Sequence, residues 1–229
     1  MKRLLFLMIV VFAVGALAPT AHAAMFLTLN DGLGHSVLVG DGSTLDQSAA
    51  IGVITYNGNL GGGVWTVNIT TGISKPVLGG PNEAKMDLNS VNVSSAGAGN
   101  LTIALTDTDF ALPQPGASLT SLIGGTSNGT VQLTSILDPD NSAFAATNTL
   151  NDVSLVSPLL GPGVIGSSQV VGIGALPTAF SLTQIVTVTH TAPGQVTSFD
   201  ANTVVPVPAA VLLGILGLGI AGLKLRKYA

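Results

Sequence analysis

The residues with the clearest potential for chemistry are two pairs of aspartates, each pair separated by one residue. Asp107 and Asp109 follow an alternating stretch of the chain, whereas Asp138 and Asp140 flank Pro139 in a turn. Carboxylates at i and i+2 in a loop supply the hard oxygen ligands that Ca²⁺ prefers, helped by backbone carbonyls. These four aspartates are the candidate calcium ligands, and solvated turn acids are the alternative interpretation.

The second pair begins like an EF-hand loop but does not continue as one. Ala143 stands at the sixth loop position, where glycine is needed, and Thr149 stands at the twelfth, where a bidentate glutamate is needed. Any calcium site here is therefore expected to be a generic one.

Catalytic residues are harder to nominate. His35 and His190 are the two histidines beyond residue 23, and a hydrolase triad needs a histidine base beside a nucleophile and an acid. Serine and aspartate are plentiful, but the chain has no Gly-x-Ser-x-Gly elbow and no cysteine. Glu83 is the only glutamate, so a glycosidase pair would consist mostly of aspartates. We expect His35 in a loop and His190 at a strand end.

The segments that must position the candidate aspartates and histidines are predicted to be β-strands. Segments 65–70 and 101–106 alternate apolar and polar residues, the pattern of a strand with one face in a core. Turn formers such as Asn57-Gly58 separate such segments. Residues 24–203 are therefore predicted to form an all-β, antiparallel β-sandwich, jelly-roll-like, with roughly ten to twelve strands.

Departures from strict alternation predict local irregularities. Leu88, Ile136 and Ile185 are each out of phase with their neighbours, which indicates β-bulges. Residues 44–50 and 82–86 have the composition of one or two helical turns, too short to be stable alone.

The charge of residues 24–203 excludes one class of partner. All eleven acidic residues lie in this range against only Lys75 and Lys85, which gives a formal charge of −9. Nucleic-acid binding requires clustered Lys and Arg, so no nucleic acid is expected. Trp65 is the only tryptophan and is expected in the core, which leaves no evident aromatic platform for stacking sugars.

The N-terminus has the pattern of a secretory signal peptide. Residues 1–23 have a basic start, an apolar stretch and a small-x-small ending at Ala21 and Ala23. Cleavage is therefore expected before Ala24.

The C-terminus combines a proline-marked junction, an apolar run and a basic end. Residues 204–223 carry no charge and are long enough to cross a bilayer of roughly 30 Å, with a transmembrane helix predicted at 207–223. A basic tail follows at 224–227 and is expected to stay at the cytoplasmic face. The residues that define the pattern are Val205, Pro206, Val207, Pro208, Gly214, Gly217, Arg226 and Lys227.

This tripartite ending resembles the sorting signal of the PEP-CTERM proteins, the exported substrates of exosortase in Gram-negative bacteria. Val205, Pro206 and Pro208 match its Val-Pro-x-Pro-Ala-Ala variant, whereas Val207 replaces the usual acid. The resemblance implies export through the inner membrane, transient anchoring at 204–229 and processing by an exosortase-type enzyme. It concerns sorting and not the activity of residues 24–203.

Two functions follow as hypotheses. The first is an exported surface or extracellular-matrix protein without catalytic activity, associated with exopolysaccharide or biofilm. The second is a secreted hydrolase acting on glycans or peptides on a β-sandwich scaffold, which requires His35 or His190 in a cleft with an acid and a serine.

Overall fold

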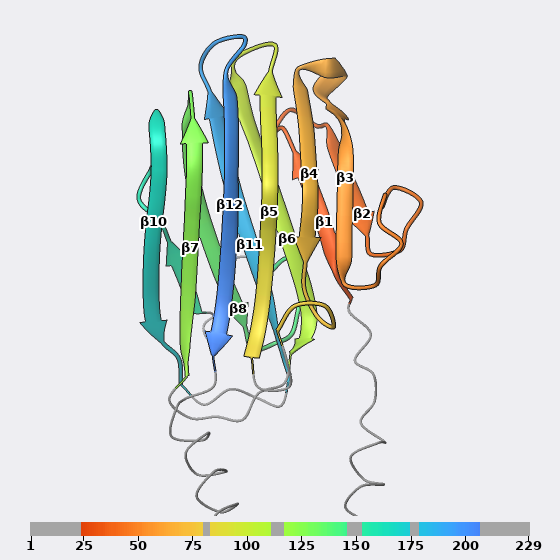
Figure 1. Cartoon of the computed structure of the whole chain (residues 1–229), viewed down its shortest axis with the longest axis vertical. Helices are drawn as coiled ribbons and strands as arrows, with labels where there is room; N and C mark the ends of the chain where they lie inside the picture. Colours follow the sequence, from red (N-terminus) through yellow and green to blue (C-terminus); the bar gives the residue numbers. More distant parts are fainter. Residues whose placement is uncertain (1–23, 80–82, 111–116, 146–152, 175–178, 207–229) are drawn as a thin grey trace, which may run out of the picture.

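Two six-stranded antiparallel sheets pack face to face in the computed structural model of the chain (Figure 1). The structure describes residues 24–79, 83–110, 117–145, 153–174 and 179–206. Sheet A has the order β2 (Ser36–Gly40), β1 (Phe26–Asn30), β6 (Gly99–Phe110), β11 (Phe180–His190), β8 (Thr130–Asp138), β9 (Val153–Val156). Sheet B has the order β10 (Gly163–Gly172), β7 (Ser118–Ser127), β12 (Val196–Pro206), β5 (Glu83–Ser95), β4 (Trp65–Ile73), β3 (Val53–Leu60).

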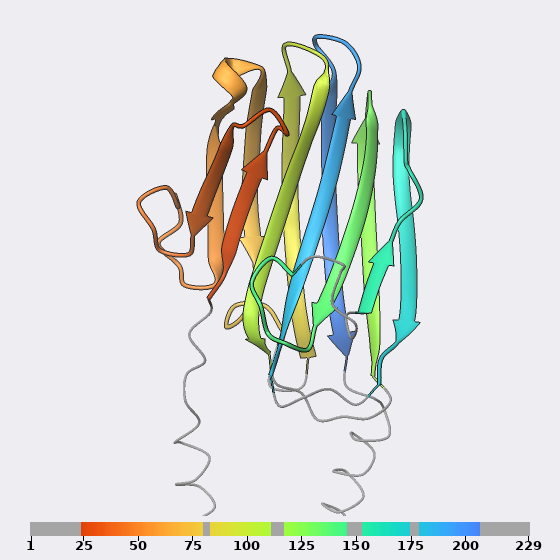
Figure 2. The same ribbon diagram turned by 180° about the vertical axis from the view of Figure 1, so that it is seen from behind.

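The predicted all-β antiparallel sandwich is confirmed, and the twelve strands within the described residues agree with the expected number. A short 3₁₀ turn at Gly61–Gly63 connects β3 to β4. Consecutive strands from β5 to β8 alternate between the sheets, as do those from β10 to β12, so neighbours within a sheet are distant in sequence (Figures 1 and 2). Strand β1 begins and β12 ends towards one end of the sandwich, while β7 and β11 end at the other (Figures 1 and 2).

The core lies between the sheets and follows from the alternation. Trp65, Val67 and Ile69 are buried while Thr66 is exposed, and Phe180 and Phe199 join Trp65 among the largest fully buried side chains. The expectation that Trp65 is a core residue is confirmed.

Buried hydroxyl and amide groups also join the two sheets across this core. Ser135 Oγ lies 2.8 Å from Ser121 Oγ and 2.7 Å from Thr203 Oγ1, and Gln184 Nε2 donates to Thr203 Oγ1 at 2.9 Å. The four residues come from β7, β8, β11 and β12, so this network fixes how one sheet sits on the other.

The out-of-phase Leu88 marks a true bulge. Leu88 and Val91 pair with Ala201 and Phe199, so two residues of β5 lie opposite the single residue Asp200. Ser90 adopts a φ of 53°, and its N–H donates to Asp200 Oδ1 at 2.6 Å. The extra residue lets both Leu88 and Val91 face the core.

The bulges predicted at Ile136 and Ile185 are wrong. Strands β8 and β11 pair in unbroken register from Ser181 to Thr189, so neither isoleucine interrupts the ladder. Ile136 instead lies on the outer face of sheet A and is fully buried there. The slip in the pattern thus reflects a strand buried on both faces.

The segment 142–145 covers this part of sheet A (Figure 2). Phe144 N donates to Thr106 Oγ1 at 3.1 Å, and Ser181 Oγ donates to the carbonyl of Ser142 at 2.7 Å. The ring of Phe144 lies 6.3 Å from that of Phe26, centroid to centroid. The covered outer face explains why Thr106 is buried in a strand that alternates.

The two predicted helical turns are wrong. Residues 83–86 belong to β5, because Ala84 and Met86 supply its core face. Residues 44–50 form turns and irregular loop, in which Asp46 Oδ1 accepts hydrogen bonds from Ser48 N and Thr55 N at 2.9 and 3.0 Å. The aspartate side chain thus takes backbone donors that a helix would use internally.

The C-terminal strand extends past residue 203. Strand β12 continues to Pro206, Val205 is fully buried opposite Ala84, and Pro206 pairs with Glu83. No helix of the described residues is both long and apolar enough to span a bilayer. The predicted signal peptide at 1–23, transmembrane helix at 207–223 and basic tail at 224–227 lie outside the described residues.

Candidate functional site

Asp107, a predicted calcium ligand, lies in the interior and joins the two sheets. Strand β6 extends to Phe110, so Asp107 belongs to the strand and not to a loop after it. Its Oδ2 accepts hydrogen bonds from Ser74 Oγ at 2.6 Å and from Lys75 Nζ at 2.9 Å. Its Oδ1 accepts one from Thr108 N at 2.8 Å. Burial raises the pKa of Asp107, against the opposing effects of the Lys75 charge and these hydrogen bonds.

The other three predicted ligands lie where β6 ends and β8 turns. Asp109 adopts a φ of 61° and is exposed, and its Oδ1 accepts a hydrogen bond from Asn141 Nδ2 at 2.7 Å. Asp138 is buried and closes the following turn: its Oδ1 accepts from Asp140 N at 2.7 Å and its Oδ2 from Ser142 N at 2.8 Å. Asp140 itself is exposed.

The structure does not bring the four aspartates together as a metal site. Asp107 faces the core, Asp109 is exposed beside a bulge, and the oxygens of Asp138 already accept backbone donors. Within the described ranges, no group of three or more His, Asp or Glu side chains is placed to hold a metal ion. The prediction assumed that Asp107 lies in a loop, and this part is wrong because Asp107 belongs to β6. Calcium binding by the aspartates stays a prediction.

His35 lies in the loop after β1, as predicted, and pairs with an acid. Its Nδ1 is 2.6 Å from Asp31 Oδ2; the histidine side chain is about half exposed and that of Asp31 is buried. Asp31 Oδ1 also accepts hydrogen bonds from Leu33 N at 2.8 Å and His35 N at 3.1 Å. Burial acts to raise the pKa of Asp31, but these hydrogen bonds together lower it. A Cβ at Gly61 would lie 2.8 Å from Asp31 Oδ2, so glycine leaves room for this pair.

His190 ends β11, as predicted, and is a core residue. Its Nδ1 lies 2.7 Å from Ser95 Oγ and its Nε2 lies 2.9 Å from Thr197 Oγ1. Its ring is 5.2 Å from the ring of Trp65, and all four side chains are buried. Burial lowers the pKa of His190, which keeps the ring neutral in this position.

These two histidines divide the parts of a triad between them. His35 has an acid partner but, in the part of the chain that the structure describes, no hydroxyl partner; His190 has two hydroxyl partners and no acid. The Ser95 hydroxyl beside His190 is buried in the core. A catalytic triad is therefore not assembled from the described residues.

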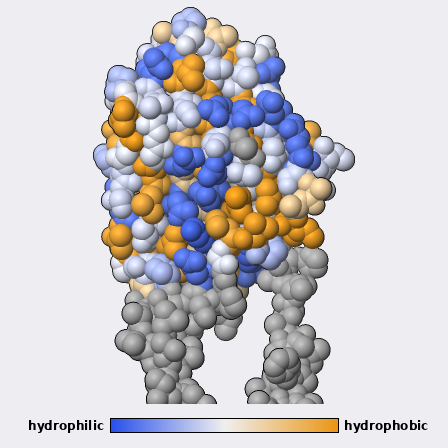
Figure 3. Space-filling model, viewed as in Figure 1, coloured by the Kyte–Doolittle hydropathy of each residue, from blue (hydrophilic) through white to orange (hydrophobic). Residues whose placement is uncertain are grey.

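The outer face of sheet B instead presents a continuous polar row. The pairing places one residue of each strand in line across the sheet, and all six side chains face outward: Asn57, Asn68, Asn92, Ser198, Thr126 and Val164. At the usual strand spacing of about 4.8 Å, the row is roughly 24 Å long. Hydrophilic side chains gather along the middle of this face (Figure 3).

The next row of outward-facing residues on sheet B is also polar. Thr66 pairs with Asn59 and Ser94, and its Oγ1 donates to Asn59 Oδ1 at 3.0 Å. On the other side of the row lie two acids, Asp200 and Asp87. Burial raises the pKa of Asp87, and the nearby Asp200 adds to this effect. The face therefore combines uncharged amides and hydroxyls with two acids at its margin, where the charge of Lys85 acts on Asp87 in the opposite direction.

No aromatic side chain of the described residues contributes to this face. Trp65 and Tyr56, on β4 and β3, point to the core and are 1 and 7% exposed. A ligand on this face would therefore be held by hydrogen bonds, since amides and hydroxyls both donate and accept.

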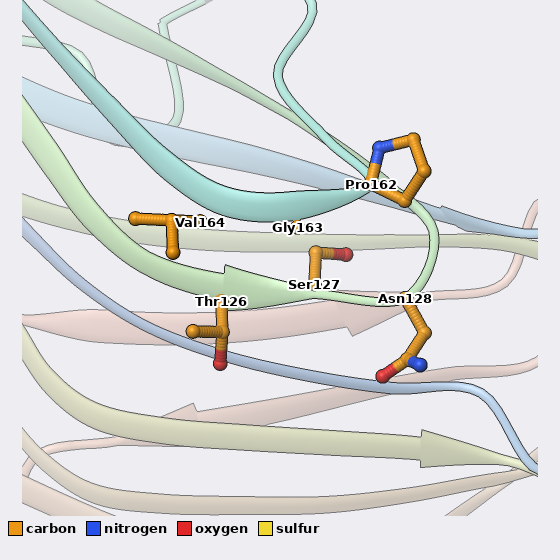
Figure 4. A pocket seen from close by; sticks show the side chains of 6 residues that line it. All are labelled: Thr126, Ser127, Asn128, Pro162, Gly163 and Val164. Atoms are coloured by element: carbon orange, nitrogen blue, oxygen red, sulfur yellow. The ribbon is translucent and has the colours of Figure 1, made fainter.

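One end of the row opens onto a shallow depression of about 380 Å³ (Figure 4). It lies between the ends of β7 and β10 and is lined by Thr126, Ser127, Asn128, Pro162, Gly163 and Val164. Thr126 and Val164 belong to both features, so the depression extends the polar row to the end of the sandwich away from the C-terminal strand end (Figure 1).

The residues predicted for sorting are divided by the last strand. Val205 and Pro206 are structural members of β12, and Ala24 lies two residues before the start of β1. The other predicted positions lie outside the described residues: Ala21, Ala23, Val207, Pro208, Gly214, Gly217, Arg226 and Lys227.

No protein-family model and no curated sequence matches the chain. Among solved structures, the carbohydrate-binding module TmCBM61, solved with β-1,4-galactotriose, is 10% identical with a TM-score of 0.33, covering 62% of this chain and 88% of that one.

Two further structures show a similar arrangement. A carbohydrate-binding module of the β-sandwich superfamily is 15% identical, with a TM-score of 0.33 and coverage of 78% of this chain and 82% of that chain. The adhesin domain of Epf from Streptococcus pyogenes is 8% identical, with a TM-score of 0.37 and coverage of 80 and 57%. Similarity at this level concerns the β-sandwich fold alone.

Proposed function

We propose that this chain is an exported, non-catalytic surface or matrix protein that binds a neutral polysaccharide on the outer face of sheet B. The observation that carries this proposal is the row of amide and hydroxyl side chains that crosses the sheet from Asn57 to Thr126. A glycan chain offers hydroxyl groups at regular intervals, and Asn, Ser and Thr can donate to and accept from each of them.

Charge selects the class of polysaccharide. Asp87 and Asp200 border the row, and residues 24–203 carry eleven acids against two lysines. An anionic polymer would be repelled at close range, whereas an uncharged one would not be. Because no aromatic ring contributes, each contact is weak, and retention depends on many contacts along the polymer.

Export and sorting complete the proposal. The signal peptide at 1–23 follows from the N-terminal pattern and the membrane helix at 207–223 from the uncharged apolar run. Processing by an exosortase-type enzyme and the surface or extracellular location follow from the resemblance at 204–229. We also propose that the sandwich is jelly-roll-like. Because β12 needs Val205 and Pro206, we expect processing to leave the chain intact through Pro206.

Mass spectrometry of the protein from its native host tests the sorting part. The mature chain is expected to begin at Ala24 and to end at or beyond Pro206 without the membrane segment. A chain that still ends at Ala229 would indicate a plain membrane-anchored protein.

The hydrolase remains the competing function, because His35 and Asp31 form an accessible acid–histidine pair. Affinity electrophoresis through gels that contain neutral or anionic polysaccharides separates the two proposals when released sugar ends are measured in parallel. The binding proposal expects slower migration in neutral gels only, with no release of sugar ends. Release that is lost in a His35→Ala variant would instead establish the enzyme.

A further inference from the structure

The four edge strands of the sandwich differ in how well they are protected against pairing with another chain. Natural sheets protect their edges with short strands, charges, prolines, bulges or covering loops. In sheet A the edges are β2 and β9, which have only five and four residues. In sheet B the edges are β3 and β10.

Strand β3 is covered by the loop that precedes it. Gln47 N donates to the carbonyl of Thr55 at 2.9 Å, and Thr55 N donates to Asp46 Oδ1 at 3.0 Å. The pairing of β3 with β4 also shifts register at Thr55, so the strand is irregular at the same point. A second chain could not add to this edge without displacing the loop.

Strand β10 has none of these protections in the part of the chain that the structure describes. All ten residues pair with β7 in unbroken register, and the strand contains no charge and no proline. Among the described residues, no hydrogen bond reaches its backbone from any partner other than β7 along its length. Val164 and Val170 are 89 and 63% exposed on its outer face, the most exposed pair of valines on one strand in the described chain.

The order of residues along β10 is self-complementary. An antiparallel partner keeps the two outer faces on the same side only if residues of equal parity oppose each other. When Ser167 lies opposite Ser167 of a second copy, Val164 lies opposite Val170 and Gly166 lies opposite Ser168. Both exposed valines are then covered by cross-strand valine contacts, twice by symmetry.

Charge also favours this edge over the rest of the surface. Residues 24–203 carry a formal charge of −9 from eleven acids and two lysines, which opposes contact between two copies. Neither β10 nor its neighbour β7 contains a charged residue. Asp200 on β12 would lie five strand spacings, about 24 Å, from its counterpart, beyond the screening length of roughly 8–10 Å.

We propose that two copies of the chain pair through β10, antiparallel and about a two-fold axis at Ser167, to form a continuous twelve-stranded sheet. The polar rows of both copies then lie on one face of this sheet. This inference rests on the edge and not on the proposed glycan binding. If glycan binding also holds, the dimer makes it bivalent.

Disulfide trapping in the full chain tests the proposal, since the chain has no cysteine of its own. Directly opposed residues in antiparallel strands have Cα atoms about 4.5–5.5 Å apart, within the disulfide range of roughly 4.4–6.8 Å. The two-fold axis places the β12 ends of the two copies at opposite ends of the dimer, so trapping is done away from a shared membrane. A Ser167→Cys variant of the full chain, extracted in mild detergent and then oxidised, is expected to give a dimer on a non-reducing gel. The matched control is Ser36→Cys, an exposed serine on edge strand β2.

A second substitution keeps the test decisive. Adding Val170→Lys to Ser167→Cys places a charge against Val164 of the other copy at both ends of the interface and is expected to abolish the trapped dimer, whereas Leu38→Lys, at another exposed edge position, is expected to leave it unchanged. Both lysines replace exposed side chains, so folding is retained. Equal trapping of Ser167→Cys and Ser36→Cys, or a dimer that survives Val170→Lys, would overturn the proposal.

Discussion

The buried ion pair between Lys75 and Asp107 should hold the two sheets together at one end of the sandwich. Asp107 is fully buried on β6 of sheet A, and Lys75, 17% exposed, follows β4 of sheet B. The Lys75 ammonium also lies 4.1 Å from the centre of the Phe110 ring and donates to the carbonyl of Thr108. Removing one partner of such a pair leaves the other buried and unpaired, which costs about 3–5 kcal/mol.

We therefore expect Asp107→Ala to lower the free energy of unfolding by about 3–5 kcal/mol. Lys75→Met should cost less at low pH than at neutral pH, because the buried carboxyl can take up a proton. The folded-state pKa of Asp107 is already raised by burial, and loss of the lysine charge raises it further. The stability linked to this carboxyl is then fully present below its unfolded-state pKa of about 3.9 and lost as pH rises through the folded-state pKa.

Chemical denaturation followed by tryptophan fluorescence measures these effects, since Trp65 is the only tryptophan and is buried. The difference between wild type and Lys75→Met is expected to be larger at about pH 7 than at about pH 4. The double variant Lys75→Met, Asp107→Leu should recover much of the loss of either single variant. A cost below about 1 kcal/mol for Asp107→Ala, or a Lys75→Met effect independent of pH, would show that solvent screens the pair.

Three further outcomes follow from packing and coordination. Val205→Ala should lower the unfolding free energy by about 2 kcal/mol in denaturation experiments, because the side chain is fully buried. The control Val204→Ala should cost much less, because Val204 is only half-buried. Equal costs would contradict a place for Val205 in the core of the domain. Gly129→Ala should lower the unfolding free energy by about 1–3 kcal/mol, since the added Cβ would lie 2.1 Å from the Thr189 carbonyl oxygen. Gly172→Ala should leave the stability unchanged, because no atom lies within 4 Å of the position of its Cβ. An unchanged stability of Gly129→Ala would contradict the tight contact. Millimolar Ca²⁺ should leave the Tm unchanged in calorimetry, because Asp107 and Asp138 already accept protein hydrogen bonds, and a rise of several degrees would restore the calcium site.

Local patterns in the sequence were enough to predict the fold class but not the way strands pair. Alternation around Trp65 and Leu101 reports which side of a strand meets a core, and both were buried as expected. The same logic located the bulge beside Leu88. At Ile136 it failed, because β8 is buried on both faces there, and alternation reports only a strand with one exposed face.

For the candidate sites too, local sequence patterns were not enough, because strand pairing decides which side chains meet. Asp107 and Asp109 resemble ligands when only their spacing is considered, but β6 extends through both and turns Asp107 towards Lys75, thirty-two residues earlier. The polar row of sheet B could not be predicted either. Asn57 and Ser198 come from strands far apart in the chain, and only the register of the intervening strands aligns them.

Glycan affinity compared between the two faces of the sandwich tests the proposed function most directly. Asn92→Ala, Ser198→Ala removes two neighbouring side chains of the polar row, whereas Thr102→Ala, Thr187→Ala removes a neighbouring pair on the outer face of sheet A. Two lost hydrogen bonds at about 0.5–1.5 kcal/mol each predict roughly tenfold weaker binding of a neutral polysaccharide for the first variant and no change for the second. Equal affinities of wild type and both variants would contradict a binding site on sheet B.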